Sequence, residues 1–131
     1  MVIDASVAVK WFLEEDRVEA AAALRRSEHD LWAPGFIQLE VAHSLWVAVR
    51  QGRTTAQAGQ LADRVLPNVV RRLVPDSELL AEAARLMRSL AHPIYDCLYL
   101  ALAFRENLTL VTADERQFEL ARRSRIRTAL L

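Results

Sequence analysis

The chain has 131 residues, 53% of them hydrophobic, and its 17 basic and 17 acidic residues leave no formal net charge. This length suits one hydrophobic core and is short for two, so we expect a single domain over residues 1–131 whose attraction to a polyanion is local. The sequence has no membrane-length apolar run, no basic secretory leader and only one cysteine, which predicts a cytoplasmic protein without membrane anchor, disulfide or cysteine-based zinc cluster.

Short apolar runs of β-favouring residues alternate with stretches of helical spacing along the whole chain. In chain order, the expected elements are a strand over Val2–Asp4, helices over Ala5–Leu13 and Arg17–Arg26, a strand over Leu31–Ala33, helices over Phe36–Arg50 and Thr55–Val65, a strand over Arg72–Val74, helices over Asp76–Leu90 and Ile94–Arg105, a strand over Leu108–Thr112, a helix over Asp114–Arg123 and a strand over Thr128–Leu131. This alternation predicts an α/β fold, a three-layer α/β/α sandwich with a mainly parallel central sheet.

Local signals mark several of the predicted boundaries. Ser6 and Asp76 can cap the helices that begin near them, and Pro93 suits the first turn of the helix that follows it. The helix over Thr55–Val65 has a thin apolar stripe, so we expect it on the periphery of the molecule.

Two acidic residues stand where a predicted strand passes into a helix. Asp4 ends the strand in VIDAS, and Asp114 follows the strand LTLVT. Ligands of parallel α/β sheets bind beyond the carboxyl ends of the strands, which makes both acids candidates for a functional site. Either acid alone is also a suitable N-cap for the helix that follows it.

Two further acids lie within predicted helices. Asp96 interrupts the otherwise uncharged segment IYDCLYLALAF, which is apolar on every face and therefore expected to be buried, so its carboxylate needs a cation or good hydrogen bonds. Glu40 lies about 60° around its helix from Ile37, at the border of the apolar face, and can point inward. The alternatives are an Asp96 paired with an arginine and a solvated Glu40.

Independent helix caps would not be expected to converge on one edge of a sheet, and this favours a joint role for the four acids. Carboxylate oxygens are hard ligands that suit Mg²⁺ or Mn²⁺ and disfavour zinc. Crowded carboxylates also raise one another's pKa values, so a bound divalent cation should stabilise the fold.

The order of VIDAS, an acid in FIQLEVAHSL, IYDCLYLALA and LVTADERQF resembles the PIN domain over nearly the whole chain, and the compact length resembles the VapC toxins of toxin–antitoxin pairs. The resemblance implies catalytic and metal-binding roles for Asp4, Glu40, Asp96 and Asp114, with Ser6 and Thr112 as supporting hydroxyls. It also implies Mg²⁺- or Mn²⁺-dependent hydrolysis of RNA phosphodiester bonds, a VapB-like antitoxin as partner, and a homodimer.

RNA that approaches a negative pocket needs basic or aromatic residues at the rim. Lys10 and Trp11 are candidates, as are the arginines of the run Arg122, Arg123, Arg125 and Arg127. Trp11 is equally suited to the core and the arginines to a solvated helix face. His29, His43 and His92 lack metal-ligand spacing, and Cys97 fits a small core residue beside Asp96.

Three other functions compete with a nuclease. A phosphoacceptor regulatory domain uses a lysine late in the fold, whereas Lys10 is the sole lysine here. A haloacid-dehalogenase-like phosphatase needs a second acid two positions after the first, where this chain has Ser6. A non-catalytic binding or scaffold module of the same fold is the third, and the four retained acids argue against it.

Overall fold

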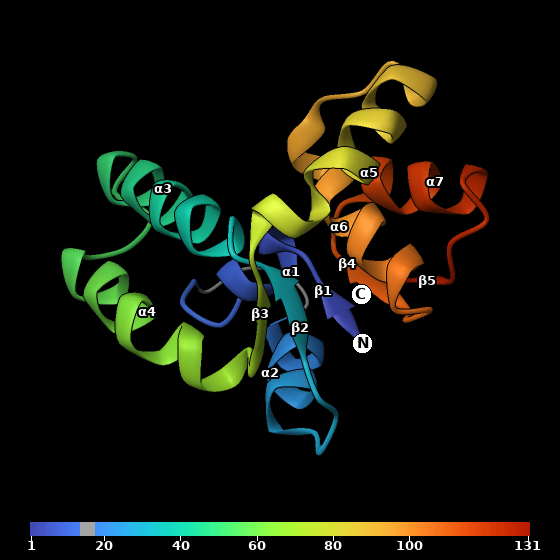
Figure 1. Cartoon of the computed structure of the whole chain (residues 1–131). Coiled ribbons are helices and arrows are strands. Elements are labelled where there is room, and N and C mark those ends of the chain that lie inside the picture. Colours follow the sequence, from blue (N-terminus) through green and yellow to red (C-terminus); the bar gives the residue numbers. More distant parts are fainter. Residues whose placement is uncertain (14–17) are drawn as a thin grey trace.

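The computed structural model describes residues 1–13 and 18–131 (Figure 1). Its elements are β1 (Val2–Ile3), α1 (Ala5–Val9), α2 (Val18–Arg26), β2 (Trp32–Pro34), α3 (Ile37–Arg50), α4 (Ala56–Val69), β3 (Arg72–Val74), α5 (Asp76–Leu90), α6 (Ile94–Arg105), β4 (Leu110–Thr112), α7 (Glu115–Arg123) and β5 (Thr128–Leu130). The predicted alternation of strands and helices is confirmed, and Arg17, the first residue of the second predicted helix, lies outside the described residues.

The five strands form one sheet in the order β3-β2-β1-β4-β5, and all four neighbouring pairs are parallel. The chain builds outward from β1 to β2 and β3, then crosses to the other side of β1 for β4 and β5. The order of the strands therefore reverses between β1 and β4, and parallel sheets bind ligands beyond the carboxyl ends of the strands at such a point.

Helices lie on both sides of the sheet, as the predicted α/β/α sandwich requires. In Figure 1, α3 and α4 lie to one side of the strands, and α5, α6 and α7 lie to the other. The two residues of β1 are fully buried, and residues 97–103 of α6 are buried throughout, so this helix forms the centre of one layer. None of the helices in the described part of the chain has the length and apolar content that crossing a membrane requires.

Two helices end elsewhere than predicted. The first helix stops at Val9 rather than Leu13, because the backbone N–H groups of Trp11 and Phe12 bond three residues back, to Ala8 and Val9, in a tighter turn. The helix predicted to end at Val65 continues as α4 to Val69. It tolerates Pro67 because its apolar stripe extends through Leu66, which is buried.

Both predicted side-chain caps are wrong. The side chain that caps α1 is that of Asp4, which accepts a hydrogen bond from the N–H of Val7, whereas Ser6 lies inside the helix. Asp76 is the first residue of α5 and does not cap it; its carboxylate accepts a bond of 3.0 Å from the N–H of Phe36. Asp76 therefore ties the start of α5 to the start of α3, a contact between residues 40 positions apart.

Candidate active site

Asp4 follows β1 directly and is the most buried of the four acids, with 5% of its surface exposed. Its Oδ1 accepts hydrogen bonds from the Ser6 hydroxyl, at 2.5 Å, and from the N–H of Val7, at 3.3 Å. Burial raises the pKa of this carboxyl from 3.8 to about 6, against the hydrogen bonds of Ser6, Thr112 and Val7, and the charge of Asp114 adds to the rise. The Asp4 carboxyl group therefore titrates at a pH closer to neutral than an ordinary aspartate does.

Glu40 reaches the site from the first turn of α3 and is half-buried. Its Oε2 accepts a hydrogen bond of 2.5 Å from the hydroxyl of Tyr99, a residue of α6. Burial raises the pKa of Glu40, the Tyr99 bond opposes this, and the charges of Asp96 and Asp4 raise it further. The prediction that Glu40 can turn inward is consistent with this geometry.

Asp96 lies in the first turn of α6, and the prediction that this helix is buried on every face is wrong there. Its side chain is 40% exposed, because the first turn emerges at the edge of the sheet. Its Oδ2 lies 2.5 Å from Nε2 of His92, which is buried. The partner of Asp96 is therefore a histidine of the preceding turn and not an arginine, and His92 has a role that its spacing alone did not indicate.

Asp114 is exposed and caps α7, where its Oδ1 accepts bonds from the N–H groups of Arg116 and Gln117. Asp4 and Asp114 thus both serve as helix caps, which was the alternative interpretation of each acid from the sequence. Two hydroxyls connect them. The Ser6 hydroxyl accepts from the N–H of Ala113 and lies 3.3 Å from that of Thr112, which in turn accepts from the N–H of Asp114.

The four acids come from four separate parts of the chain, and the charges of some of them affect the pKa values of others. The charge of Asp114 contributes to the raised pKa of Asp4, and the charges of Asp96 and Asp4 contribute to that of Glu40. The pKa of the buried Tyr99 hydroxyl lies well above its usual value, because of burial and because of the charges of Glu40, Asp4 and Asp96. Asp4 and Asp114 follow the neighbouring strands β1 and β4, whereas Glu40 and Asp96 lie in the first turns of α3 and α6.

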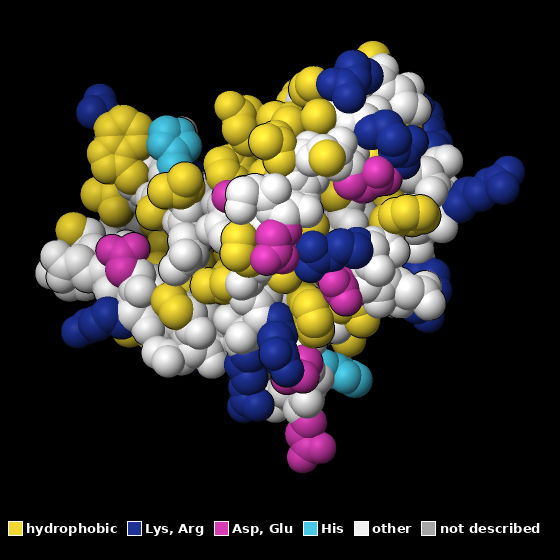
Figure 2. Space-filling view, in the orientation of Figure 1, with side chains coloured by type: hydrophobic (Ala, Val, Ile, Leu, Met, Phe, Trp, Pro, Cys, Tyr) yellow, Lys and Arg dark blue, Asp and Glu magenta, His cyan; other side chains and the backbone are white. Residues whose placement is uncertain are grey.

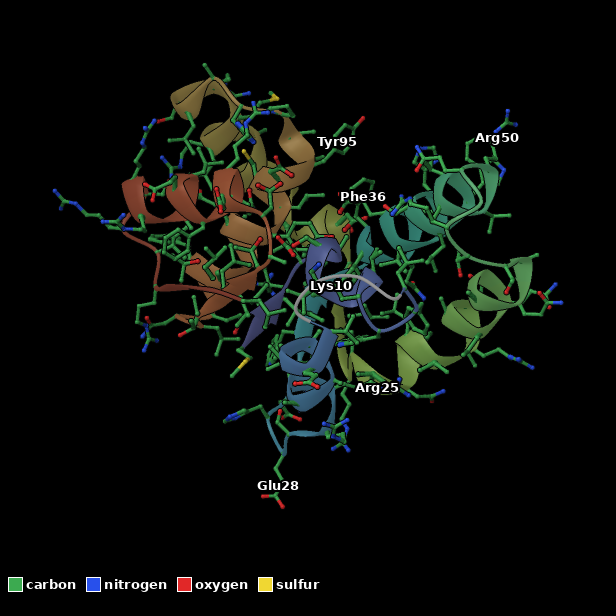
Figure 3. The ribbon with its side chains drawn as sticks, turned by 180° about the vertical axis from the view of Figure 1, so that it is seen from behind. Lys10, Arg25, Glu28, Phe36, Arg50 and Tyr95 are labelled. Carbon is green, nitrogen blue, oxygen red and sulfur yellow. The ribbon has the colours of Figure 1, made fainter. Side chains whose placement is uncertain are left out.

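Two of the four acids, Glu40 and Asp114, line an open cleft of about 460 Å³. Its other lining residues are Ala5, Ser6, Val9, Lys10, Ser44 and Ala113. Lys10 is one of the lining residues, and Figure 3 shows it near the middle of that view. Its contact with RNA stays a prediction. The cleft thus opens onto both the C-terminal edge of the sheet and the start of α3.

The other predicted RNA contacts do not line this cleft. Trp11 packs against the core and donates its indole N–H to the Ala21 carbonyl, which favours the core alternative. Arg122 and Arg123 lie in the last turn of α7, at the opposite end of the helix from Asp114. Arg122 also pairs with Glu119, as expected of a solvated face.

Sequence reasoning missed two residues that hold the acids. Tyr99 was recognisable in principle, because a hydroxyl in an otherwise apolar segment needs a partner and lies three residues after Asp96, on the same helical face. Gln117 is buried and donates its side-chain amide to the backbone carbonyl of Asp96, joining α7 to α6. Cys97 is a buried core residue, as expected, and burial with the nearby Asp96 raises its pKa to about 11.

The donor set fits a hard divalent cation. Among the residues that the structure describes, no three Asp, Glu, His or Cys side chains lie close enough to coordinate one ion as they stand. Mg²⁺ does not require such a cage, because it is commonly held by one or two carboxylates and several waters. The carboxylates of Glu40 and Asp114 line the open cleft beside the buried Asp4, and such a set is suited to this kind of binding.

Comparisons with known proteins agree with this architecture. The family model described as PIN domain matches residues 1–123. Among solved structures, the chain is similar to one described as the crystal structure of FitAcB from Neisseria gonorrhoeae, with a TM-score of 0.66 and 14% sequence identity over 97% of this chain and 94% of that chain. At this identity the similarity shows the fold alone. A search of curated proteins gave no match.

Proposed function

We propose that this chain, which belongs to the PIN domain family, is a metal-dependent endoribonuclease and the toxin of a VapBC-type toxin–antitoxin pair. Proteins of this family are generally nucleases, which supports hydrolysis of a phosphodiester bond. The observation that carries the proposal is that Glu40 and Asp114, from two separate segments, line one open cleft together with Ser6, whose hydroxyl donates to the buried carboxylate of Asp4.

In this proposal, Asp4 and Asp96 would be the principal ligands of Mg²⁺ or Mn²⁺, and Glu40 and Asp114 would complete the site or orient water. A bound ion would lower the pKa of a water molecule and offset the charge on the leaving oxygen. The hydroxyl of Tyr99 holds the Glu40 carboxylate in one orientation through their 2.5 Å hydrogen bond. Rigid support of this kind reduces the reorganisation needed when substrate binds.

The hydroxyls beside Asp4 complete the arrangement. Ser6 donates to Asp4 and accepts from the N–H of Ala113, so it joins the end of β1 to the residue after β4. Thr112 is fully buried and accepts from the N–H of Asp114. Both hydroxyls therefore fix the positions of the acids, and Lys10 on the cleft wall is suited to a phosphate oxygen.

A non-catalytic binding module of the same fold is the second candidate, and one observation favours it. Asp4 and Asp114 each cap a helix, and Asp96 is paired with His92, so these three acids have structural partners without any metal. The two candidates differ in whether loss of one of these carboxylates abolishes RNA cleavage or only alters stability.

Cleavage of single-stranded RNA of random sequence, with the cut ends sequenced, tests the enzyme. We expect Mg²⁺ or Mn²⁺ to support cuts that leave a 5′-phosphate and a 3′-hydroxyl, and Asp96→Asn to abolish them. Asp63→Asn is the matched control, because Asp63 is an exposed acid on α4. Absence of cleavage with both ions would contradict the enzyme and favour the binding module, and full activity of Asp96→Asn would contradict the role of Asp96 in the reaction.

The toxin role, the VapB-like antitoxin, the homodimer and the cytoplasmic location are parts of the same proposal. Induced expression in a bacterial host should arrest growth, and Asp96→Asn should not. Co-expression of the small open reading frame beside the gene should restore growth and yield a complex that purifies together. Growth arrest that is equal for the wild type and Asp96→Asn would contradict a toxin that acts by cleavage.

A further inference from the structure

Two aromatic rings stack on the surface beside Glu40. Phe36 precedes α3 and Tyr95 stands in the first turn of α6, with their ring centroids 5.0 Å apart and their planes at 17°. Tyr95 has 56% of its surface exposed, and in Figure 3 it points away from the ribbon. Asp76 fixes this part of the backbone by accepting the N–H of Phe36. The stacked pair is thus held in place and open to solvent.

A groove of about 360 Å³ runs along this pair and is lined by Phe36, Leu39, Glu40, His43, Ser44 and Tyr95. Glu40 and Ser44 also line the cleft of the candidate site, so the groove and the cleft are adjacent. Figure 2 shows hydrophobic side chains gathered on the surface between α3 and α5, in this region of the molecule. A strand of nucleic acid with a phosphate at the carboxylates would place a neighbouring base at the groove.

We propose that Phe36 and Tyr95 form a stacking platform for an unpaired nucleobase next to the cleaved phosphate. This inference rests on the proposed nuclease function and names a substrate-binding subsite for it. Unpaired RNA bases bind proteins by stacking on aromatic rings. The platform would favour single-stranded over double-helical RNA, because a base must leave its helix to reach the rings.

Charge supports a contact of this kind. The chain has no formal net charge, and among the residues that the structure describes, Lys10 and His43 are the only basic side chains that line the cleft and the groove. Attraction to phosphates is therefore a small source of affinity beside four carboxylates that repel RNA. Stacking depends little on charge and can supply the affinity that the cleft lacks.

An apolar protein partner is the competing occupant of this surface. Glu40 stands in the wall of the groove, and Asp96 follows Tyr95 directly in the sequence. A closely packed apolar partner would bury these carboxylates without compensation, which is costly. A base stacked on the rings leaves both carboxylates uncovered, and the position of the groove next to the cleft therefore favours RNA.

Binding of a ten-nucleotide single-stranded RNA that carries one 2-aminopurine tests the platform, since the fluorescence of this base falls when it stacks. The titration is done in EDTA, so that the reading does not depend on cleavage. We expect Tyr95→Leu to weaken the Kd about tenfold and to lose the quenching, because stacking contributes most of the contact. Tyr95→Phe keeps the ring and should behave as the wild type.

Phe104→Leu is the control for loss of an exposed aromatic ring, because Phe104 lies near the other end of α6 and is 62% exposed. It should bind RNA as the wild type does. Thermal unfolding of each variant shows that it folds, and gel filtration gives its oligomeric state.

Several results would overturn the platform. One is an absence of quenching in the wild type at saturating protein, and another is an unchanged Kd and quenching in Tyr95→Leu. A third is a Tyr95→Leu variant that loses self-association while its RNA affinity stays the same, which would assign the surface to a protein. In each of these cases, RNA cleavage that depends on Asp96 would still support the nuclease. If instead the wild type cleaves no RNA but Tyr95→Leu weakens RNA binding, the platform is supported and the nuclease is refuted.

Discussion

Replacement of Asp4 by asparagine separates the stability of the protein from its proposed activity. Two of the hydrogen bonds to the Asp4 carboxylate, from Ser6 and from the N–H of Val7, go to Oδ1. An asparagine carbonyl in the same place accepts both, and asparagine is as good an N-cap as aspartate. Asp4→Asn therefore removes the charge and keeps the contacts.

The size of the effect follows from the pKa of Asp4. Its rise from 3.8 to about 6 corresponds to about 3 kcal/mol, because each tenfold change in proton affinity is worth about 1.4 kcal/mol. The folded state holds this proton more tightly than the unfolded state. The stability that protonated Asp4 contributes is thus fully present below pH 3.8 and is lost as the pH rises through about 6.

We expect the metal-free Asp4→Asn variant to be more stable than the wild type at pH 8 by about 3 kcal/mol, and the difference to shrink toward zero at pH 4. Urea unfolding in EDTA at pH 4, 6 and 8 measures it. RNA cleavage by the variant should be lost even though its stability has risen. Asp63→Asn, which changes an exposed acid on α4, should show no such pH dependence.

Parallel curves of unfolding free energy against pH for Asp4→Asn and the wild type would refute this reasoning. They would mean that burial does not penalise the charge of Asp4 in the folded state. A variant less stable than the wild type at every pH would instead show that asparagine cannot keep the cap of α1.

Three further predictions concern the same region. Tyr99→Phe should lower the free energy of unfolding by about 1.5 to 3 kcal/mol at pH 7 and slow RNA cleavage, because Glu40 loses a charge-assisted hydrogen bond; equal urea midpoints would count against this. Mg²⁺ should raise the melting temperature of the wild type more at pH 8 than at pH 5, and hardly at all in Asp4→Asn, because ligand carboxylates must be deprotonated; calorimetry with and without the ion decides. Ala91→Gly should stabilise the protein by about 1 kcal/mol in urea, because Ala91 ends α5 at a φ of 49°, and loss of stability would show that its methyl group packs usefully.

Much of the fold could be read from local patterns. Apolar residues recur in the sequence with the period of a helix or of a strand, so the type and order of the elements were predictable. The ends of the elements depend on individual hydrogen bonds and were not. The second half of α4 illustrates this, since its continuation past Val65 through Pro67 depends on the burial of Leu66 against other parts of the chain.

The candidate site was predictable only in part. Asp4 and Asp114 could be placed because each follows a strand, and a strand's carboxyl end is a local property of the sequence. The exposure of Asp96 could not, because it depends on where the first turn of α6 meets the edge of the sheet. Its pairing with His92 did not follow from helical spacing either, because His92 lies before the start of α6 although the two stand four residues apart.

The sequence by itself determined the alternation of strands and helices, the acids at the ends of β1 and β4, and the apolar segment that became α6. Only the tertiary structure decided that Tyr99 donates to Glu40 across 59 residues and that Asp76 holds Phe36 across 40. The spacing of apolar residues indicates which side of a helix or strand is buried, and this spacing involves only residues close together in the sequence. Which distant side chains meet depends on strand order and helix packing, and these are set by the free energy of the whole core.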